Sequence, residues 1–360
     1  MSDRHDPKAL LSDPGVLNPS RLLEFGGWQG AEKTGGVAIL PWRSDWLQAT
    51  AASVEAHPDA SAIEGEQFNQ ALVHLQKSRD ATWQDLCSAW RLLIPGGRLL
   101  LCGGNDLGIV SAVKRLAKEL QQTPQILSNR RRARIVAFEQ TDHTSMHPAS
   151  PESHPIWLPI PGQEPIEMEA AAGAFSAKKI DSGTQLLLDA IAHHDATPEL
   201  ILDMACGIGT LALAALIRWP SARAVLADAD ARAVASAQRN ADRIGVGARA
   251  RTFWWDAHEN FPAEGGDLLL LNPPFHTGKA VDLAPARAMF KRAEESLRPG
   301  ATALLVANRT LPYEKDLEAL GRLRILSETR HYKLLSARKR SRSSVSSKRH
   351  SPGPSSRGRS

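Results

Sequence analysis

The chain has 360 residues, of which 42% are hydrophobic and 23% charged, as is typical of a globular protein with two domains. No apolar run approaches the roughly 18 residues of a membrane-spanning helix, and the N-terminus lacks the apolar core of a secretion signal, so we expect a cytoplasmic protein. Residues 338–360 carry eight Lys or Arg and no acid, which leaves 36 basic and 39 acidic residues elsewhere. The net charge of +5 therefore indicates a basic tail and not a basic fold.

The first 140 residues are predicted to form one domain of helices and strands. A strand over 71–75 runs into Gln76-Lys77-Ser78, and a helix then leads to a Pro-Gly turn at Pro95 and a second apolar strand. The second half of the chain ends in the same order of helix, turn and strand when Pro95 is set on Pro299. This similarity favours a duplication, with a degenerate first copy over 1–140.

Two segments divide the chain. Residues 141–165 are rich in Pro, His, Ser and Thr and are predicted to be a linker. Its histidines lack the spacing of metal ligands, and the three cysteines of the chain lie far apart, so no metal site is expected. Residues 338–360 mix Ser, Arg, Lys, Gly and Pro and are predicted to be a disordered tail, whose cations leave RNA binding an open alternative.

Between these segments, residues 166–337 alternate short apolar runs with amphipathic stretches. This alternation predicts an α/β domain with a mostly parallel sheet. Buried strands are expected at 200–202, 224–227, 268–271 and 303–307, and helices at 210–218, 231–244 and 284–297.

A glycine-containing turn follows the first of these strands. The sequence Asp203-Met-Ala-Cys-Gly-Ile-Gly209 stands between a strand and a helix, where glycines let the backbone approach a ligand. It is not the dinucleotide fingerprint, because the third glycine is missing and an acid comes first. The acid favours a nucleoside-like ligand with hydroxyl or amino groups, although a simple tight turn is the plain alternative.

Two further acids follow the next two strands. Asp228 ends the strand 224–227, where a carboxylate can accept both ribose hydroxyls, and Asp230 is interpreted as the cap of the following helix. Asp256 follows Phe253-Trp254-Trp255 and could accept a hydrogen bond from an adenine amine, with Ala257 supplying its backbone N–H. A strand-end turn would explain Asp256 equally well on its own.

The strongest motif is Asn272-Pro273-Pro274-Phe275, directly after the strand 268–271. An amine conjugated to a base or an amide is a poor nucleophile because its lone pair is delocalised. The side-chain oxygen of Asn272 and the Pro273 carbonyl can each accept one N–H of such an amine, and the prolines stiffen the loop. Phe275 could then stack on a flipped-out ring.

With these motifs in this order, the second half resembles the class I S-adenosylmethionine-dependent methyltransferases, and in particular the bacterial ribosomal RNA guanine-N2 methyltransferases of the RsmC and RlmG type. His276, Gly278-Lys279, the segments 306–309 and 311–313, and Tyr332-Lys333 carry the narrower resemblance, and 173–176 and 181–188 are similar to the segment before the catalytic core. In that family the first half is a degenerate methyltransferase domain. The chain departs from it at Ala205-Cys206, where many relatives have Gly-Cys, and at Ala229-Asp230 in place of Glu-Ser.

The resemblance implies two tandem Rossmann-like domains, S-adenosylmethionine as cofactor, ribosomal RNA or a ribosomal subunit as partner, and a monomer. It implies methylation of a guanine N2, with 16S rRNA favoured. A 23S rRNA guanine, another planar amine (adenine N6 or a protein glutamine) and a non-catalytic RNA-binding assembly factor stay open as alternatives. The implied catalytic residues are Asn272, Pro273, Pro274 and Phe275. The implied cofactor-binding residues are Asp203, Cys206, Gly207, Gly209, Asp228, Asp256, Ala257, Phe175 and Gln185.

Overall fold

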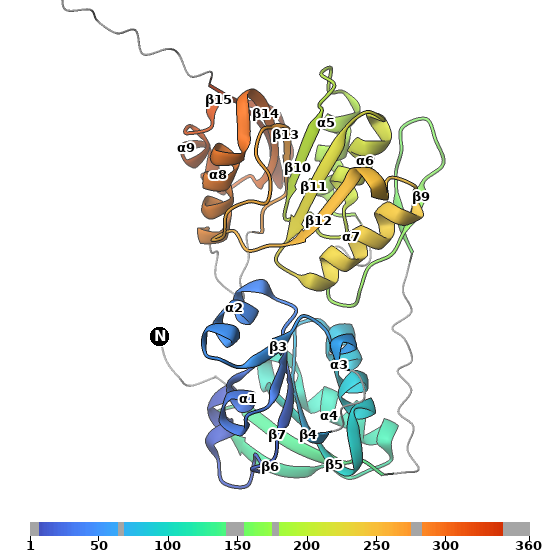
Figure 1. Ribbon diagram of the computed structural model, residues 1–360, viewed down its shortest axis with the longest axis vertical. Helices are drawn as coiled ribbons and strands as arrows, with labels where there is room; N and C mark the ends of the chain where they lie inside the picture. Colours follow the sequence, from blue (N-terminus) through green and yellow to red (C-terminus); the bar gives the residue numbers. More distant parts are fainter. Residues whose placement is uncertain (1–6, 64–67, 142–154, 175–179, 275–282, 341–360) are drawn as a thin grey trace, which may run out of the picture.

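The computed structural model describes residues 7–63, 68–141, 155–174, 180–274 and 283–340. Two α/β domains follow one another along the chain, each built on a seven-stranded sheet (Figure 1). The predicted fold of two tandem Rossmann-like domains is thereby confirmed. None of the helices in the described ranges is long and apolar enough to cross a membrane. Phe175, Phe275 and the residues of the predicted tail from 341 onward lie outside the described ranges.

The first sheet has the order β3-β2-β1-β4-β5-β7-β6, and β7 alone runs antiparallel to the other six strands. Its strands are β1 Leu22–Phe25, β2 Val37–Ile39, β3 Glu55–His57, β4 Phe68–His74, β5 Leu93–Gly104, β6 Gln125–Arg130 and β7 Ala133–Glu139. Its helices are α1 Gln29–Thr34, α2 Arg43–Ala51, α3 Arg79–Arg91 and α4 Ile109–Leu120, with short 3-10 turns at Pro7–Ser12, Ala60–Ala62 and Asn105–Leu107.

The second sheet repeats this order as β12-β11-β10-β13-β14-β16-β15. Its strands are β10 Leu200–Met204, β11 Arg223–Asp228, β12 Ala250–Trp254, β13 Gly266–Leu271, β14 Leu297–Asn308, β15 Gly321–Glu328 and β16 Tyr332–Lys339. Its helices are α5 Ser182–Ala192, α6 Thr210–Arg218, α7 Ala231–Arg243, α8 Ala284–Ser296 and α9 Tyr313–Leu317, with a 3-10 turn at Gly247–Arg249. The shared order is the architecture that a duplication would leave.

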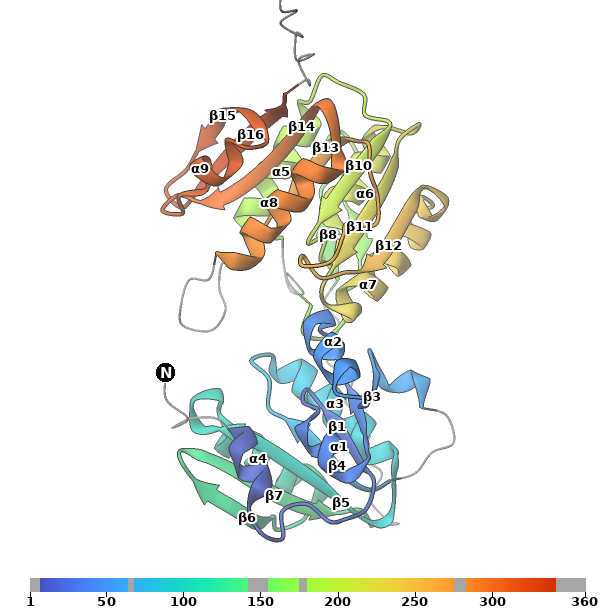
Figure 2. The same ribbon diagram turned by 60° about the vertical axis from the view of Figure 1, so that its left-hand side comes forward.

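Helices cover both faces of the second sheet, and successive side chains along each strand point to opposite faces. Along β10, Ile201 packs with α5, α6 and α7, whereas Leu202 packs with α8 and α9 on the opposite face. The strands are nearly continuous apolar runs because a parallel sheet in this position is buried on both sides. Figure 2 shows α5 and α6 behind the sheet and α8 in front of it.

The predicted linker contains regular structure of its own. β8 (Ile156–Leu158) pairs antiparallel with β9 (Ile166–Met168) in a two-stranded sheet. Ile156, Leu158 and Met168 are fully buried against the core that α5, α6 and α7 form. This hairpin is short and flanked by prolines, so its sequence carries no strand pattern long enough to be recognised.

Candidate active site

The carboxyl edge of the second sheet brings the predicted motifs together. The strand register sets Met204 of β10 opposite Ala227 of β11 on one side and Leu271 of β13 on the other. The turn that begins at Ala205 therefore lies between Asp228 and Asn272. This is the position at which open α/β sheets bind their ligands.

The turn after β10 has the backbone conformation that its glycines allow. Gly207 and Gly209 have φ values of +55° and +91°, and a Cβ atom added to Gly207 would meet no atom of the described residues within 4 Å. The space over Gly207 is therefore open to a ligand. Ala205 also has a positive φ, +64°, which an L-residue adopts at a cost. A glycine at this position would adopt the same conformation without that cost.

Asp203 is fully buried beneath this turn. Its Oδ2 accepts a hydrogen bond from the Ala212 backbone N–H at 3.0 Å, which ties β10 to α6. Its Oδ1 is buried without a hydrogen-bond partner among the described residues. Burial and, to a smaller extent, the nearby Asp228 carboxylate raise the pKa of Asp203 to about 7. An unsatisfied buried carboxylate oxygen is costly unless a ligand supplies a donor.

Asp228 ends β11 and is held in place by backbone groups. Its Oδ2 accepts from Gly207 N at 2.8 Å, and its Oδ1 accepts from Asp230 N at 2.9 Å. Burial raises its pKa to about 6. Asp230 is the N-cap of α7, where its side chain accepts from Arg232 N, as interpreted from the sequence. Asp228 and the glycine turn therefore form one unit.

Asp256 and Ala257 follow β12 and lie next to this unit. Trp255 N donates to Asp228 O at 2.9 Å, so the loop after β12 is bonded to the end of β11. Asp256 accepts from His258 N at 2.9 Å, and its own N–H donates to Glu259 Oε2 at 3.1 Å. The buried Ala257 is the next residue. Cys206 is buried as well, and burial raises the pKa of its thiol well above the usual value.

On the other side of the turn, Asn272 follows β13, and its side-chain nitrogen is held by two residues at the start of α5. Nδ2 donates to Thr184 Oγ1 at 3.0 Å and to Asp181 Oδ2 at 3.4 Å. The Thr184 hydroxyl donates to Asp181 at 2.5 Å, so it has only a lone pair to offer Asn272. This fixes the orientation of the amide, and no residue in the described ranges donates to its oxygen. Pro273 is buried and Pro274 exposed.

Asp181 and Thr184 are functional candidates that the sequence motifs did not identify. Asp181 caps α5 by accepting from Gly183 N and Thr184 N. An Asp before an apolar helical run signals such a cap. Nothing in the sequence, however, indicates contact with a residue about 90 positions away.

Gln185 is the predicted site residue that the described structure does not bring to this group. Its side chain donates to Asp189 at 3.0 Å. It lines a cavity of about 480 Å³ together with Pro159, Leu188 and Ala214, none of which is a predicted cofactor residue. Within the described ranges, no three His, Cys, Asp or Glu side chains gather as a metal site would require.

The fold, the glycine turn and the acids at successive strand ends define a class I S-adenosylmethionine-dependent methyltransferase. Residues 165–336 match the family described as Methyltransferase small domain. A curated relative from Pseudomonas aeruginosa (strain LESB58), named Ribosomal RNA small subunit methyltransferase C, is 32% identical over 76% of this chain and 80% of its own. The relative of the same name from Pseudomonas entomophila is 31% identical over 75% and 79%.

Among solved structures, the T. thermophilus 16S rRNA N2 methyltransferase RsmC, in complex with AdoMet and guanosine, shares this fold. Its TM-score is 0.81 at 24% identity, and the match covers 93% of this chain and 91% of the other. By its sequence relatives, the chain belongs to the ribosomal RNA small subunit methyltransferase C family. This confirms the family that the sequence motifs indicated.

Proposed function

We propose that the protein transfers a methyl group from S-adenosylmethionine to the exocyclic N2 of a guanine in 16S rRNA. The observation that carries this proposal is the orientation of Asn272, whose nitrogen is bonded to Thr184 and Asp181 and whose oxygen has no donor among the described residues. A planar amine presents two N–H groups and needs acceptors to orient it. The names of the two Pseudomonas relatives support the small-subunit RNA as substrate.

The residues at the carboxyl edge fit the cofactor. Asp203 has a buried oxygen that lacks a donor among the described residues, and the amino group of the methionine moiety would supply one. The open space over Gly207 admits the ligand beside Cys206 and Gly209. Asp228 is proposed to hold the ribose hydroxyls, and Asp256 with the N–H of Ala257 the adenine. Phe175 and Gln185 stay predictions from the resemblance.

In the proposed reaction, the cofactor supplies a methyl group already activated by its sulfonium, so the transfer needs no metal ion. The Asn272 oxygen and the Pro273 carbonyl each accept one N–H of the guanine amine and direct its lone pair toward the methyl donor. Pro274 stiffens the loop that holds these acceptors, and Phe275 is proposed to stack on the ring. The amine proton leaves to water once alkylation has made it acidic.

We further propose that the protein acts in the cytoplasm, where ribosomal subunits are assembled, and that it acts as a monomer. The test is mass spectrometry of nucleosides after incubation of the enzyme and S-adenosylmethionine with 16S rRNA, with 30S subunits and with 23S rRNA. N2-methylguanosine in 16S rRNA or 30S subunits is expected. Methylation only in 23S rRNA or at adenine N6 would redirect the proposal, as would a methylated protein glutamine found by peptide mass spectrometry. No methylation of any substrate would favour an assembly factor.

A further inference from the structure

The N-terminal domain contacts the catalytic domain through a short backbone pairing. Trp42 and Asp230 form an isolated antiparallel bridge. Arg43 N donates to Ala229 O, and Ala231 N donates to Pro41 O, both at 2.8 Å. Residues 41–43 therefore lie as a short added strand along the loop after β11, directly beyond Asp228. Figures 1 and 2 show α2, which begins at Arg43, between the two domains.

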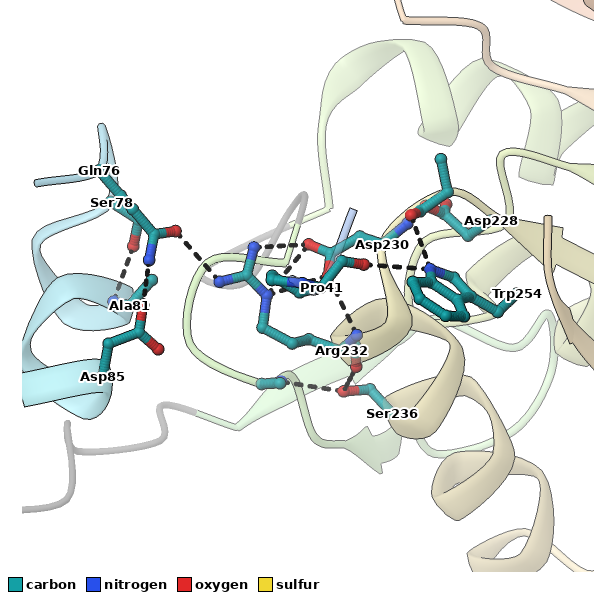
Figure 3. Close-up of polar contacts among 12 residues, drawn as sticks. Pro41, Gln76, Ser78, Ala81, Asp85, Asp228, Asp230, Arg232, Ser236 and Trp254 are labelled. Carbon is teal, nitrogen blue, oxygen red and sulfur yellow. Dashed lines mark hydrogen bonds and ion pairs between the residues drawn. The ribbon is translucent and has the colours of Figure 1, made fainter. Parts of the chain in front are cut away.

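The same segment also contacts the end of β12. The indole Nε1 of Trp254 donates to Pro41 O at 3.1 Å and to Ala229 O at 2.9 Å (Figure 3). Trp254 thus links the end of β12 and the loop after β11 to the N-terminal domain. Trp46 of α2 packs edge-on against Trp254, with ring centroids 5.5 Å apart. The Arg43 guanidinium lies 4.7 Å and 5.1 Å from the centres of these two rings.

Arg43 then extends to the loop that carries Asp256. Its Nε and Nη2 donate to the two carboxylate oxygens of Glu259 at 2.9 Å and 2.8 Å. Glu259 Oε2 also accepts from the backbone N–H of Asp256 at 3.1 Å. Only 21% of the Arg43 side chain and 32% of the Glu259 side chain are exposed, so solvent weakens this ion pair less than one at the surface. Arg43 therefore acts on the Asp256 backbone through Glu259.

A second contact reaches the same region from another part of the N-terminal domain. The Arg232 guanidinium donates to both oxygens of Asp230 and, through Nη1, to Gln76 Oε1 at 3.2 Å (Figure 3). Gln76 is itself fixed, because its N–H donates to Thr82 and its amide nitrogen to Asp85. Two separate N-terminal segments thus bond to this region, residues 41–43 to the loop after β11 and Gln76 to Arg232 in the first turn of α7.

We infer that Arg43 is a positioning residue for the cofactor: through Glu259 and the bridge beside Asp228, the N-terminal domain sets the loops that hold adenosine. The inference rests on the proposed roles of Asp228 and Asp256. The contacts end on the loops after β11 and β12, whereas the amine acceptor Asn272 follows β13. Loss of Arg43 therefore weakens cofactor binding and leaves the methyl-transfer step and RNA affinity nearly unchanged.

The test compares Arg43→Ala with a matched control, Arg21→Ala. Arg21 also pairs with a glutamate, Glu55, and also lies over an aromatic ring, Phe68, but all three belong to the N-terminal domain. Calorimetry with S-adenosylmethionine is expected to give a Kd about tenfold higher for Arg43→Ala and unchanged for Arg21→Ala. The KM for S-adenosylmethionine rises in parallel, while kcat at saturating cofactor and the KM for RNA stay within twofold. Arg43→Lys restores part of the affinity, because it keeps the charge but loses the bidentate geometry.

An unchanged Kd in Arg43→Ala would overturn the inference. So would an equal rise in Arg21→Ala, or a fall in kcat that matches the rise in KM, since either points to general destabilisation. If Arg43→Ala does not fold, Glu259→Gln takes its place, because glutamine keeps an acceptor for the Asp256 N–H and removes the ion pair. Its Kd must rise as well. Failure of the wild-type protein to bind S-adenosylmethionine would refute the proposed function itself. Normal binding by both the wild type and the Arg43 variant would refute only the inference about Arg43.

Discussion

The two domains have the same sheet and differ at the edge where a ligand would bind. In the first domain Glu24 occupies the position of Asp203 in the second. Glu24 lies on β1, between β2 and β4, and Asp203 lies on the corresponding strand β10, between β11 and β13. Both acids are fully buried, and both accept a backbone N–H from the following helix, from Ala31 at 2.7 Å and from Ala212 at 3.0 Å. The buried acid therefore serves the fold in both domains.

The two domains differ in the turn that follows the buried acid. Asp203 bonds to the helix nine residues further along the chain, whereas Glu24 bonds only seven residues on, so the first turn is two residues shorter. A Cβ atom on Gly27 would lie 2.5 Å from His74 Nε2, while nothing lies within 4 Å of one on Gly207. In the first domain the His74 side chain fills this space, whereas in the second domain the described residues leave it open.

The residue that fills this space occupies the position of Asn272, the proposed amine acceptor. The registers set Glu24 opposite Leu72 and Asp203 opposite Leu270, so His74 corresponds to Asn272. The sequence pattern alone places Gln76-Lys77-Ser78 at the position of the proline-rich loop. The strand register shows that this interpretation is wrong by two residues. His74 Nε2 and Glu24 Oε1 lie 2.7 Å apart, which closes the edge. A closed copy can still support its neighbour, as the contacts of Arg43 and Gln76 indicate.

The largest effect is expected at Asn272. Asn272→Ala removes the side-chain acceptor of the amine and should lower kcat by about a thousandfold or more, as loss of one preorganised polar group does. The Kd for S-adenosylmethionine should stay within about threefold. Single-turnover methylation of RNA and calorimetry measure the two quantities. Asn129→Ala, an exposed site on β6, is the control. Wild-type turnover in Asn272→Ala would refute the assignment.

A smaller effect follows from the buried acids. The pKa values of Asp203 and Asp228 in the cofactor-free protein are about 7 and about 6, because burial favours their protonated forms. Folding of the free protein thus becomes less favourable as the pH rises from about 4 to about 7, where the folded state loses these protons. The cofactor, with its cationic groups, favours the ionised forms. Its binding should therefore release protons and tighten as the pH rises.

Titration of Asp203 alone should make the Kd for S-adenosylmethionine about tenfold higher at pH 6 than at pH 8. Asp203→Asn should remove most of this dependence, since asparagine keeps an acceptor for the Ala212 N–H but does not titrate. Glu24→Gln, the corresponding change in the first domain, should leave the pH profile of binding as it is. Calorimetry across this pH range measures both. A pH-independent Kd in the wild type would argue against contact between Asp203 and the cofactor.

Next in size is the effect of the residues that orient Asn272. Thr184→Val keeps the shape of the side chain but removes the oxygen to which Asn272 Nδ2 donates. The amide can then turn, and kcat should fall by about tenfold, with the cofactor Kd unchanged. Thr34→Val, which removes a hydroxyl bonded to Gly30 O in the first domain, is the matched control. Equal losses in the two variants would mean that Thr184 has only a structural role.

The sequence was sufficient to predict those features of the two domains that depend on a local pattern of residues. Acids and glycines at the ends of apolar runs located Asp203, Asp228 and Asp256, because strand ends in a parallel sheet share one edge. It was insufficient where a contact depends on register or on docking. Thr184 meets Asn272 across 88 residues, His74 fills a pocket only through the exact strand pairing, and Arg43 meets Glu259 across a domain boundary.

The smallest effect on catalysis is expected at the Glu24–His74 pair, which closes the edge of the first sheet. Glu24→Ala leaves the Ala31 N–H and the buried His74 ring without their acceptor and should lower the free energy of unfolding by about 1–3 kcal/mol. Calorimetry should still give one S-adenosylmethionine per chain with wild-type affinity, because the pocket in the first domain is closed by a short turn as well as by a side chain. Thermal unfolding supplies the stability. A second bound cofactor in this variant would mean that the Glu24–His74 pair alone separates the two domains.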